Sequence, residues 1–459
     1  MGNNNYVVAI DLGFNKVVAA LGTISADGQT IIKEIVSKPL EGGFVRGEIT
    51  NIELVSTALN SAIEELEQRA GIKVDEAVVG TSGRQIVFAT NSGFVYVGSD
   101  GEIRNSDVEK LCDNMNNVQA PEGKVILSRL PQYYKIDTHE IKGSPVGGFG
   151  RHLEATYGYV MASKAVLERI DKAFDRVGIK DRTYLPSAMA SALVASYDEE
   201  RESGVATIDI GANTTDVAVY YDNKVRYVAS IPLGSDAINN DIRATAVPKN
   251  SVEKLKTRHG YATASAIPFE LLNSVIRIPG RKGQEKNKDI SYRDLTAIIE
   301  CRLVDIINFV NEVLRDSGYH DRIETLVLTG GGSQLKGIEV LFQERTGITT
   351  RKDVAASFGE ESVAEAAEPA NATVVGLLMM AIAQSDIKPT PQQQTSNEED
   401  IEDDEEWDES NDKKPKREKK RGEKKDNGPR VSFFDRIKKA IGKVDEAVFG
   451  KDIVDDEDI

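Results

Sequence analysis

Two stretches of this sequence combine an aspartate, a glycine and small polar residues in a pattern that could hold a phosphate and its metal ion. The first runs through Asp11, Gly13, Asn15 and Lys16. Asp11 ends an apolar run and could bind Mg²⁺ through water, while Gly13 lets backbone N–H groups approach an oxyanion closely. Lys16 could reach a β- or γ-phosphate, and it could equally be a solvated lysine on a strand.

The second stretch lies about one domain length later and contains Asp209, Gly211, Asn213, Thr214 and Thr215. Asp209 offers a second water-mediated contact to Mg²⁺, and the threonines add hydroxyl donors. Aligned on their aspartates, residues 11–15 match residues 209–213, with apolar, β-branched runs on both sides. Each stretch therefore predicts a β-hairpin with a polar turn, and either hairpin alone is compatible with an ordinary surface turn. The pair predicts a duplicated fold that grips one ligand between its halves.

A glycine triplet supplies the third candidate element. Gly330, Gly331, Gly332 and Ser333 follow a buried strand expected over 323–329, with a helix expected from about Leu335. Glycines let the backbone pass flat against a ligand, and the start of a new helix favours anions. The triplet is weak evidence alone and strong evidence downstream of two matched turns.

An acid–base pair is the fourth candidate. Glu253 and Lys256 lie three residues apart in a helix expected over 251–259, so they share one face. They form either a surface ion pair, or a carboxylate for ribose hydroxyls beside an ammonium for a base.

The elements that must position these residues alternate between strand and helix, which predicts α/β architecture. Residues 1–82 are expected to form the first-lobe core, and 163–383 the rest of that core and a second lobe. Between them, 83–162 read as an inserted α+β subdomain in which short strands surround one helix at 106–117. The expected strands of this insert are 85–90, 93–97, 124–131, 132–137 and 154–160. The small residues of 184–193 predict a close contact between elements.

Composition narrows the function classes. A chain of 459 residues is too long for a single hydrophobic core, so two or more domains are expected. The net charge of −17 argues against nucleic-acid binding. With only two cysteines, the protein is expected to work in the reducing cytosol. Its four histidines form no zinc-binding motif. Residues 1–6 are polar and do not have the pattern of a signal peptide, so secretion is not expected. No run approaches the roughly 18 apolar residues of a spanning helix. Any membrane contact is therefore expected to be peripheral.

The C-terminal part changes character. Residues 384–430 carry an acidic run and then a basic run, which predicts a disordered linker. Residues 431–450 predict an amphipathic helix that lies in an anionic membrane interface, with docking into a partner's groove as the alternative. The residues expected to contact the membrane are Phe433, Phe434, Arg436, Ile437, Lys438, Lys439, Ile441, Lys443 and Val444.

The order of these features is similar to that of the actin/Hsp70/sugar-kinase superfamily, with its phosphate-1, phosphate-2 and adenosine motifs. Within it, the chain resembles the FtsA family of bacterial cell-division proteins. The narrower resemblance rests on EGGFVRG at 41–47, LPQYYKID at 130–137, KTRHG at 256–260, the insert after Gly83 and the tethered basic terminus. It covers about residues 6–383 and the terminal segment.

The resemblance implies a two-lobed actin-like fold, built from duplicated ribonuclease-H-like domains, with ATP and Mg²⁺ in the cleft. It gives phosphate roles to the two turns, an adenosine role to residues 330–333, and ribose and base roles to Glu253 and Lys256. Ala212 and Asn213 depart from the glycines common in the second turn, which makes hydrolysis more doubtful than binding. No general base stands out, so turnover is expected to be slow and the catalytic residues remain unassigned.

The resemblance also implies a function. The family polymerises at the cytoplasmic face of the bacterial inner membrane at the division site. It anchors filaments of the tubulin-like protein FtsZ to anionic lipids and recruits later division proteins. The C-terminal tail of FtsZ is expected to bind a small subdomain at about 241–303. A small-molecule kinase and a pilus-assembly relative of the same superfamily are the alternatives, and neither has a use for a tethered basic helix.

Overall fold

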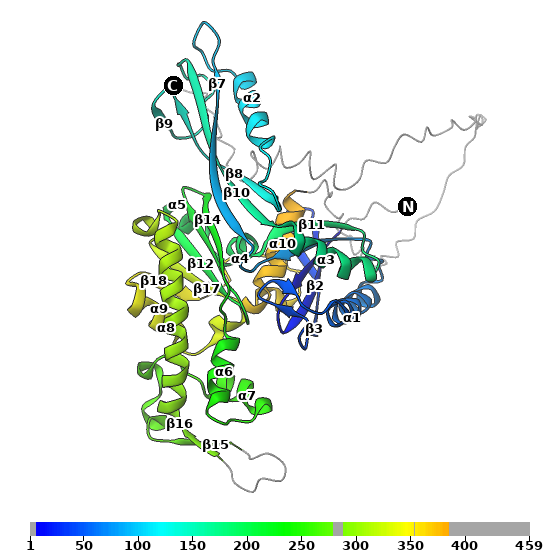
Figure 1. Ribbon diagram of the computed structural model, residues 1–459, viewed down its shortest axis with the longest axis vertical. Helices are drawn as coiled ribbons and strands as arrows, with labels where there is room; N and C mark the ends of the chain where they lie inside the picture. Colours follow the sequence, from blue (N-terminus) through cyan, green and yellow to red (C-terminus); the bar gives the residue numbers. More distant parts are fainter. Residues whose placement is uncertain (1–5, 279–287, 353, 385–459) are drawn as a thin grey trace, which may run out of the picture.

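The computed structural model describes residues 6–278, 288–352 and 354–384, and Figure 1 shows two sheet-containing lobes side by side. A third sheet projects beyond them at the top of the view, and a small subdomain extends the second lobe at the bottom. The predicted two-lobed α/β architecture with an inserted subdomain is confirmed.

The first lobe is built on a five-stranded sheet in the order β11-β6-β1-β2-β3. Its strands are β1 (Val7–Leu12), β2 (Lys16–Ile24), β3 (Thr30–Pro39), β6 (Glu76–Thr81) and β11 (Asp181–Pro186). β1, β2 and β3 form an antiparallel meander, and β6 and β11 run parallel to β1. α1 (Ile52–Ala70) and α3 (Lys164–Arg176) belong to this lobe, as do the short β4 (Phe44–Val45) and β5 (Glu48–Ile49). The expected stop of α1 is confirmed, because Gly71 adopts φ 66°.

The second lobe repeats the same plan in the order β14-β13-β12-β17-β18. Its strands are β12 (Val205–Ile210), β13 (Thr215–Tyr221), β14 (Lys224–Ile231), β17 (Thr325–Thr329) and β18 (Thr349–Lys352). Again three antiparallel strands are followed by two parallel ones. α8 (Tyr292–Asp316) and α9 (Ile338–Thr346) contribute buried apolar residues to its core. Both predicted hairpins therefore occupy equivalent places in equivalent sheets.

Two helices are exchanged between the lobes. α4 (Ser187–Ala195) follows the last strand of the first sheet but packs against β12, β13 and β14 of the second. α10 (Ala372–Ala383) follows the second sheet but packs against β1, β2 and β6 of the first, where Figure 1 shows it in orange among blue strands. A Cβ on Gly376 would lie 1.9 Å from the carbonyl oxygen of Ala190, so the two helices cross at a glycine. The close contact expected from the small residues of 184–193 is confirmed.

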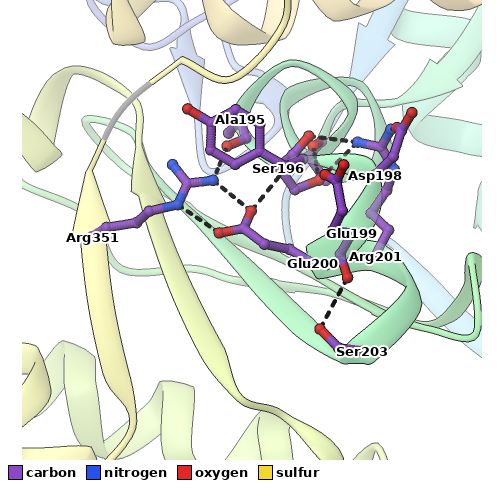
Figure 2. A network of polar contacts seen from close by, with 10 residues as sticks. Ala195, Ser196, Asp198, Glu199, Glu200, Arg201, Ser203 and Arg351 are labelled. Carbon is purple, nitrogen blue, oxygen red and sulfur yellow. Dashed lines mark hydrogen bonds and ion pairs between the residues drawn. The ribbon is translucent and has the colours of Figure 1, made fainter.

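A polar network in the second lobe joins β18 to the segment that leads from α4 into β12 (Figure 2). Arg351, at the end of β18, donates through Nε to Glu200 on α5 (Asp198–Ser203) at 2.7 Å. Its Nη2 donates to the carbonyl oxygen of Ala195 at 2.9 Å, and its guanidinium lies 4.7 Å from the ring centre of Tyr197. Burial opposes ionisation of Glu200, but the hydrogen bonds from Arg351 and from Tyr197 N, together with the charges of Arg351 and Arg201, outweigh it and lower the pKa of that carboxyl.

The insert forms a four-stranded sheet in the order β7-β10-β8-β9, and the helix α2 contacts β7 and β10. Its elements are β7 (Val87–Tyr96), α2 (Asn105–Asn116), β8 (Lys124–Ile136), β9 (His139–Ile141) and β10 (His152–Ser163). The expectation of separate strands at 85–90 and 93–97, and at 124–131 and 132–137, was wrong, because each pair is one continuous strand.

The physical reasons differ between the two strands. Gly93 does not end a strand in β7. A glycine is needed there because α2 packs closely, and a Cβ would lie 2.5 Å from Sδ of Met115. Pro131 is accommodated in β8 by a bulge, in which Gln132 has no partner on β10. The side chain of Gln132 then turns to the second lobe, where its Nε2 donates to Val225 O at 2.9 Å.

The small subdomain of the second lobe lies between β14 and α8. It contains α6 (Asp236–Ala244), α7 (Lys249–His259), β15 (Val275–Ile278) and β16 (Lys288–Ser291). Short 3₁₀ helices complete the described chain, at Ala264–Ala266, Phe269–Leu271, His320–Arg322, Gly331–Gln334, Ala364–Ala367 and Pro369–Asn371. Within the described ranges, no helix is both long and apolar enough to span a bilayer. The predicted linker and membrane helix at 384–430 and 431–450 lie, apart from Gln384, outside those ranges.

Candidate functional site

A cleft of about 470 Å³ opens between the lobes, and the predicted ligand residues meet in it. All but two of them line its wall. Those that do are Asp11, Gly13, Asn15, Lys16, Asp209, Gly211, Asn213, Thr214, Glu253, Lys256, Gly330, Gly331 and Gly332. Residues more than 300 positions apart in the sequence thus surround one space, because the two hairpins face each other across it.

The two turns have the same backbone design. In the first, Gly13 N donates to Lys16 O at 3.0 Å, and in the second, Gly211 N donates to Thr214 O at 2.9 Å. A Cβ on Gly13 would lie 2.9 Å from Lys16 O, and one on Gly211 would lie 3.0 Å from Thr214 O. Each turn is therefore tight enough to favour glycine, as the matched sequences predict.

Three aspartates line the cleft. Burial, together with the nearby charge of Asp209, raises the pKa of Asp11 to about 6, against an opposing effect of Lys16. Burial also raises the pKa of Asp209, although Thr373 donates to its Oδ2 at 2.8 Å. The pKa of Asp216 lies well above its ordinary value because of burial and the charge of Asp209.

This carboxylate arrangement suits a hard cation, because Mg²⁺ prefers oxygen ligands and would relieve the repulsion between the two turn aspartates. Among the described residues, no three acidic, histidine or cysteine side chains converge as a direct metal cluster. The contact predicted for Asp11 and Asp209 needs only two carboxylates and metal-bound water, and it stays a prediction.

The cationic side chains of the cleft have different partners. Lys16 Nζ donates to Ala370 O at 3.2 Å and to Asn371 Oδ1 at 3.4 Å, in the segment that returns to the first lobe. Lys256 is buried and lies 3.0 Å from Glu253 Oε2. The ion pair considered from the sequence is thus present, and both of its members also line the cleft.

The glycine triplet packs directly on the second turn. A Cβ on Gly330, which has φ 81°, would lie 2.2 Å from Asp209 Oδ1, and one on Gly332 would lie 2.5 Å from Ile210 Cγ2. A Cβ on Gly331 would meet nothing within 4 Å, so protein packing does not demand a glycine there. The expected helix start near Leu335 was wrong, because a 3₁₀ turn intervenes and α9 begins at Ile338.

Two predicted residues lie behind the wall instead of on it. Thr215 is fully buried, and its hydroxyl donates to Leu233 O at 2.8 Å. Ser333 is also buried, and its hydroxyl donates to Gly330 O at 2.8 Å. Both side chains therefore support the loops that form the cleft.

Sequence reasoning missed several cleft residues. Asp216 stands directly opposite Asp209 in the β12–β13 register, and strand alternation places it on the same face as Thr214. That alternation was the signal that selects Asp216 over Thr215. Gly234 was also missed; it does not line the cleft but packs behind the second turn, where a Cβ would lie 2.6 Å from the backbone of Ala212. Arg46 and the segment 369–373 gave no local signal, because only the fold brings them to the cleft.

Comparison with known proteins places these features in one family. Residues 206–376 match the model of cell division protein FtsA, and residues 83–161 match the SHS2 domain inserted in FtsA. Cell division protein FtsA of Pseudomonas aeruginosa is 33% identical over 83% of this chain and 90% of its own. The FtsA proteins of Escherichia coli (strain K12) and Neisseria meningitidis are 29% and 27% identical, over 81% and 86% of this chain and 89% and 94% of theirs.

A solved structure from a type IV pilus biogenesis complex, PilM–PilN, is similar to this chain with a TM-score of 0.56. It covers 82% of this chain and 98% of its own at 16% identity, which shows a shared fold. The sequence relatives are closer and span most of both chains. From these matches the chain belongs to the family of cell division protein FtsA.

Proposed function

We propose that this chain binds ATP with Mg²⁺ between its lobes, polymerises, and anchors FtsZ filaments to the cytoplasmic face of the bacterial inner membrane at the division site. The observation that carries the proposal is the meeting of two matched turns and a glycine loop across one cleft, in a chain of a cell-division family. Bound Mg²⁺ would neutralise phosphate charge. Lys16 and the backbone N–H groups of the turns would bind the phosphates.

ATP acts in this proposal as an assembly ligand. It touches both lobes, so it favours the lobe arrangement in which both turns reach it. Slow turnover is expected, because Ala212 and Asn213 put side chains where a second turn made of glycines would leave space. Later division proteins are expected to join the assembled filament.

Membrane attachment is assigned to residues 431–450. One short amphipathic helix binds anionic lipid weakly, but many helices joined in a filament bind tightly through effective concentration. The segment follows the linker 384–430, whose length lets it reach a surface without constraining the lobes.

The FtsZ tail is assigned to the small subdomain. A groove of about 380 Å³ lies between this subdomain and the start of α8, with Ile267 and Leu272 as its apolar part and Arg293 and Glu300, both on α8, as its charged part. Arg293→Glu should weaken binding of an FtsZ tail peptide about tenfold in a fluorescence anisotropy titration. Arg277→Glu, on the exposed β15 of the same subdomain but outside the groove, is the matched control. Equal affinities for all three proteins would place the tail elsewhere.

The experiment that tests the whole proposal is co-sedimentation with anionic vesicles. The intact chain and a chain ending at Arg430 are compared, each with and without ATP and Mg²⁺. We expect binding that requires the last segment, rises with nucleotide, and loses the nucleotide effect in Asp209→Asn. Equal sedimentation of both chains would reject the membrane role. It would reopen the search for a small-molecule substrate, which the kinase alternative requires.

A further inference from the structure

The turn between β4 and β5 holds an arginine in an unusual backbone conformation. Arg46 has φ 51°, a left-handed value that residues other than glycine rarely adopt. Of the other four described residues with such φ values, Asp137, Asp222 and Asn223 belong to the two types that tolerate it best, and Ala246 is the fourth. Backbone strain of this kind clusters at binding sites and switch regions, and Arg46, unlike Ala246, lines the cleft.

The Arg46 side chain is exposed and lines the cleft. The other two cations of the cleft already have protein partners, Lys16 in the returning segment and Lys256 in Glu253. In the part of the chain that the structure describes, the guanidinium of Arg46 has no hydrogen-bonding or ionic partner. An exposed arginine without a partner gains little from its charge in the free protein, so this charge is available to a ligand.

The turn is locked against the root of the inserted subdomain. A Cβ on Gly47 would lie 2.2 Å from Ser82 O, and a Cβ on Gly83 would lie 2.3 Å from Arg46 O. Gln85 Nε2 donates to Gly47 O at 3.4 Å. The backbones of the two turns therefore touch, and the turn of Arg46 cannot shift without moving residues 82–85, which lead directly into β7.

The same root also touches the second lobe beside the phosphate end of the cleft. Gly83 N donates to Ser230 Oγ at 2.8 Å, and Ser230 hydrogen-bonds the carboxyl of Asp216. Asp216 and Ser230 face each other in the β13–β14 register. Arg46, the root of the insert and the buried carboxylates thus form one connected region, while Glu253 and Lys256 belong to α7 in the small subdomain.

We propose that Arg46 binds the terminal phosphate of a nucleoside triphosphate, and that its turn transmits the presence of that phosphate to the inserted subdomain. This inference rests on the proposed nucleotide function. The guanidinium suits the task, because its planar fork matches two phosphoryl oxygens and its charge persists at every physiological pH. A diphosphate ends short of this position and leaves the arginine free.

The direct test compares ATP and ADP affinities by isothermal titration calorimetry in the full chain, with Mg²⁺. Arg46→Gln should weaken ATP about 10- to 100-fold and ADP by less than twofold, while Arg46→Lys recovers part of the loss. Equal losses for both nucleotides, or no loss for either, would overturn the inference. If the unaltered chain bound neither nucleotide, the proposed function itself would fail, and this result is distinct because it does not depend on the variant.

A second variant tests whether the strain serves the ligand. Arg46→Gly relieves the left-handed conformation, so it should raise the melting temperature without nucleotide by about 1–3 °C while lowering ATP affinity as Arg46→Gln does. Asn223→Gly, at a left-handed position in the β13–β14 turn far from the cleft, is the matched control and should leave ATP affinity unchanged. A lower melting temperature for Arg46→Gly would show that the arginine stabilises its own turn, and would count against the inference.

Transmission to the insert has its own readout. Hydrogen exchange of residues 82–96 should slow with ATP relative to ADP in the unaltered chain. Arg46→Gln should remove that difference even when ATP is added to saturation. A difference that persists in saturated Arg46→Gln would mean that the insert senses nucleotide by another route, and would overturn this half of the proposal.

Discussion

The two turns that face each other across the cleft share one backbone and differ in chemistry. The first carries a flexible cation, Lys16, and its aspartate stays partly exposed to the cleft. The second carries only small neutral side chains, and its aspartate is 6% exposed. The start of α6 also fixes the backbone of the second turn, because Ser235 N donates to Gly211 O and Asp236 N donates to Ala212 O.

If both turns bind one ligand, as we propose, this difference divides the work of binding between them. The fixed turn provides a rigid surface of backbone donors, and the glycine loop packs directly on it. The turn with the lysine provides an adaptable charge, which in the free protein is satisfied by Ala370 O. The two turns therefore have the same backbone shape, while their different side chains, Lys16 in the first and small neutral residues in the second, give each turn a different chemistry.

The largest expected effect tests whether both turns hold the same ligand. Asp11→Asn and Asp209→Asn should each weaken ATP–Mg²⁺ binding at least about 100-fold, since a charged interaction with the metal is lost in both. Calorimetry at pH 7.5 measures it. A large loss in only one variant would break the equivalence of the turns.

The pH dependence sharpens this test. The pKa of Asp11 is raised to about 6 in the folded protein, so ATP–Mg²⁺ affinity should fall as pH drops through 6, because the protonated carboxyl no longer attracts the metal. Without ligand, the raised pKa favours folding fully below the unfolded value of about 4, and that contribution disappears as pH rises through 6. Asp11→Asn without nucleotide should therefore be more stable at pH 7.5, by about 1–2 kcal/mol. A denaturant titration showing reduced stability would contradict this.

The glycines of the two turns should behave alike. Gly13→Ala and Gly211→Ala each push a methyl group against a carbonyl oxygen, so each should lower the free energy of unfolding by about 1–3 kcal/mol and weaken ATP. Gly331→Ala is the contrasting variant, because its Cβ meets no protein atom. It should keep the parental melting temperature and still lose ATP affinity, which separates damage to the ligand site from damage to the fold.

Side-chain divergence predicts unequal losses elsewhere. Lys16→Met removes the charged contact of the first turn and should weaken ATP about tenfold, equivalent to about 1.4 kcal/mol. Thr214→Val removes one neutral donor and should cost less, about two- to fivefold. Binding titrations with ATP compare the two directly. The reverse order would mean that the second turn, and not the first, carries the main phosphate contact.

The smallest expected effect concerns the network of Figure 2, which joins β18 to the α4–α5 segment within the second lobe and does not include a residue that lines the cleft. Glu200→Gln should lower the free energy of unfolding by about 1 kcal/mol and leave ATP affinity unchanged. Since the folded pKa of Glu200 lies below its ordinary value, this contribution is present above about pH 4.5 and is lost as pH falls through the folded pKa. Glu199→Gln, on the same helix without an ion pair in the described residues, is the control.

Much of the fold was predictable because its signals are local. The hairpins β1–β2 and β12–β13 could be predicted from apolar, β-branched runs on both sides of a repeated turn sequence. α1 could be predicted from the helical spacing of its apolar residues and from the glycine that ends it. The insert was harder, since Gly93 and Pro131 read as breaks although a packing helix and a bulge keep both strands continuous.

The cleft lining was predictable where one segment contains both a strand and the polar residues that follow it. Arg46 and the segment 369–373 could not be found in this way, because they reach the cleft only through contacts between distant parts of the chain. The sequence analysis proposed both Thr214 and Thr215 as hydroxyl donors, but strand alternation turns Thr215 into the core and Asp216 toward the cleft.

The exchange of α4 and α10 constrains how the chain is made. On the ribosome, the strands of the first sheet emerge early, but the helix that packs against β1, β2 and β6 emerges only with residues 372–383. One apolar face of the N-terminal sheet therefore stays uncovered by α10 while nearly 200 further residues are synthesised, from the end of β11 at 186 to the start of α10 at 372. At typical elongation rates this takes about 10–40 seconds. We therefore expect a chain truncated before α10 to expose this apolar face and to aggregate instead of forming a working first lobe.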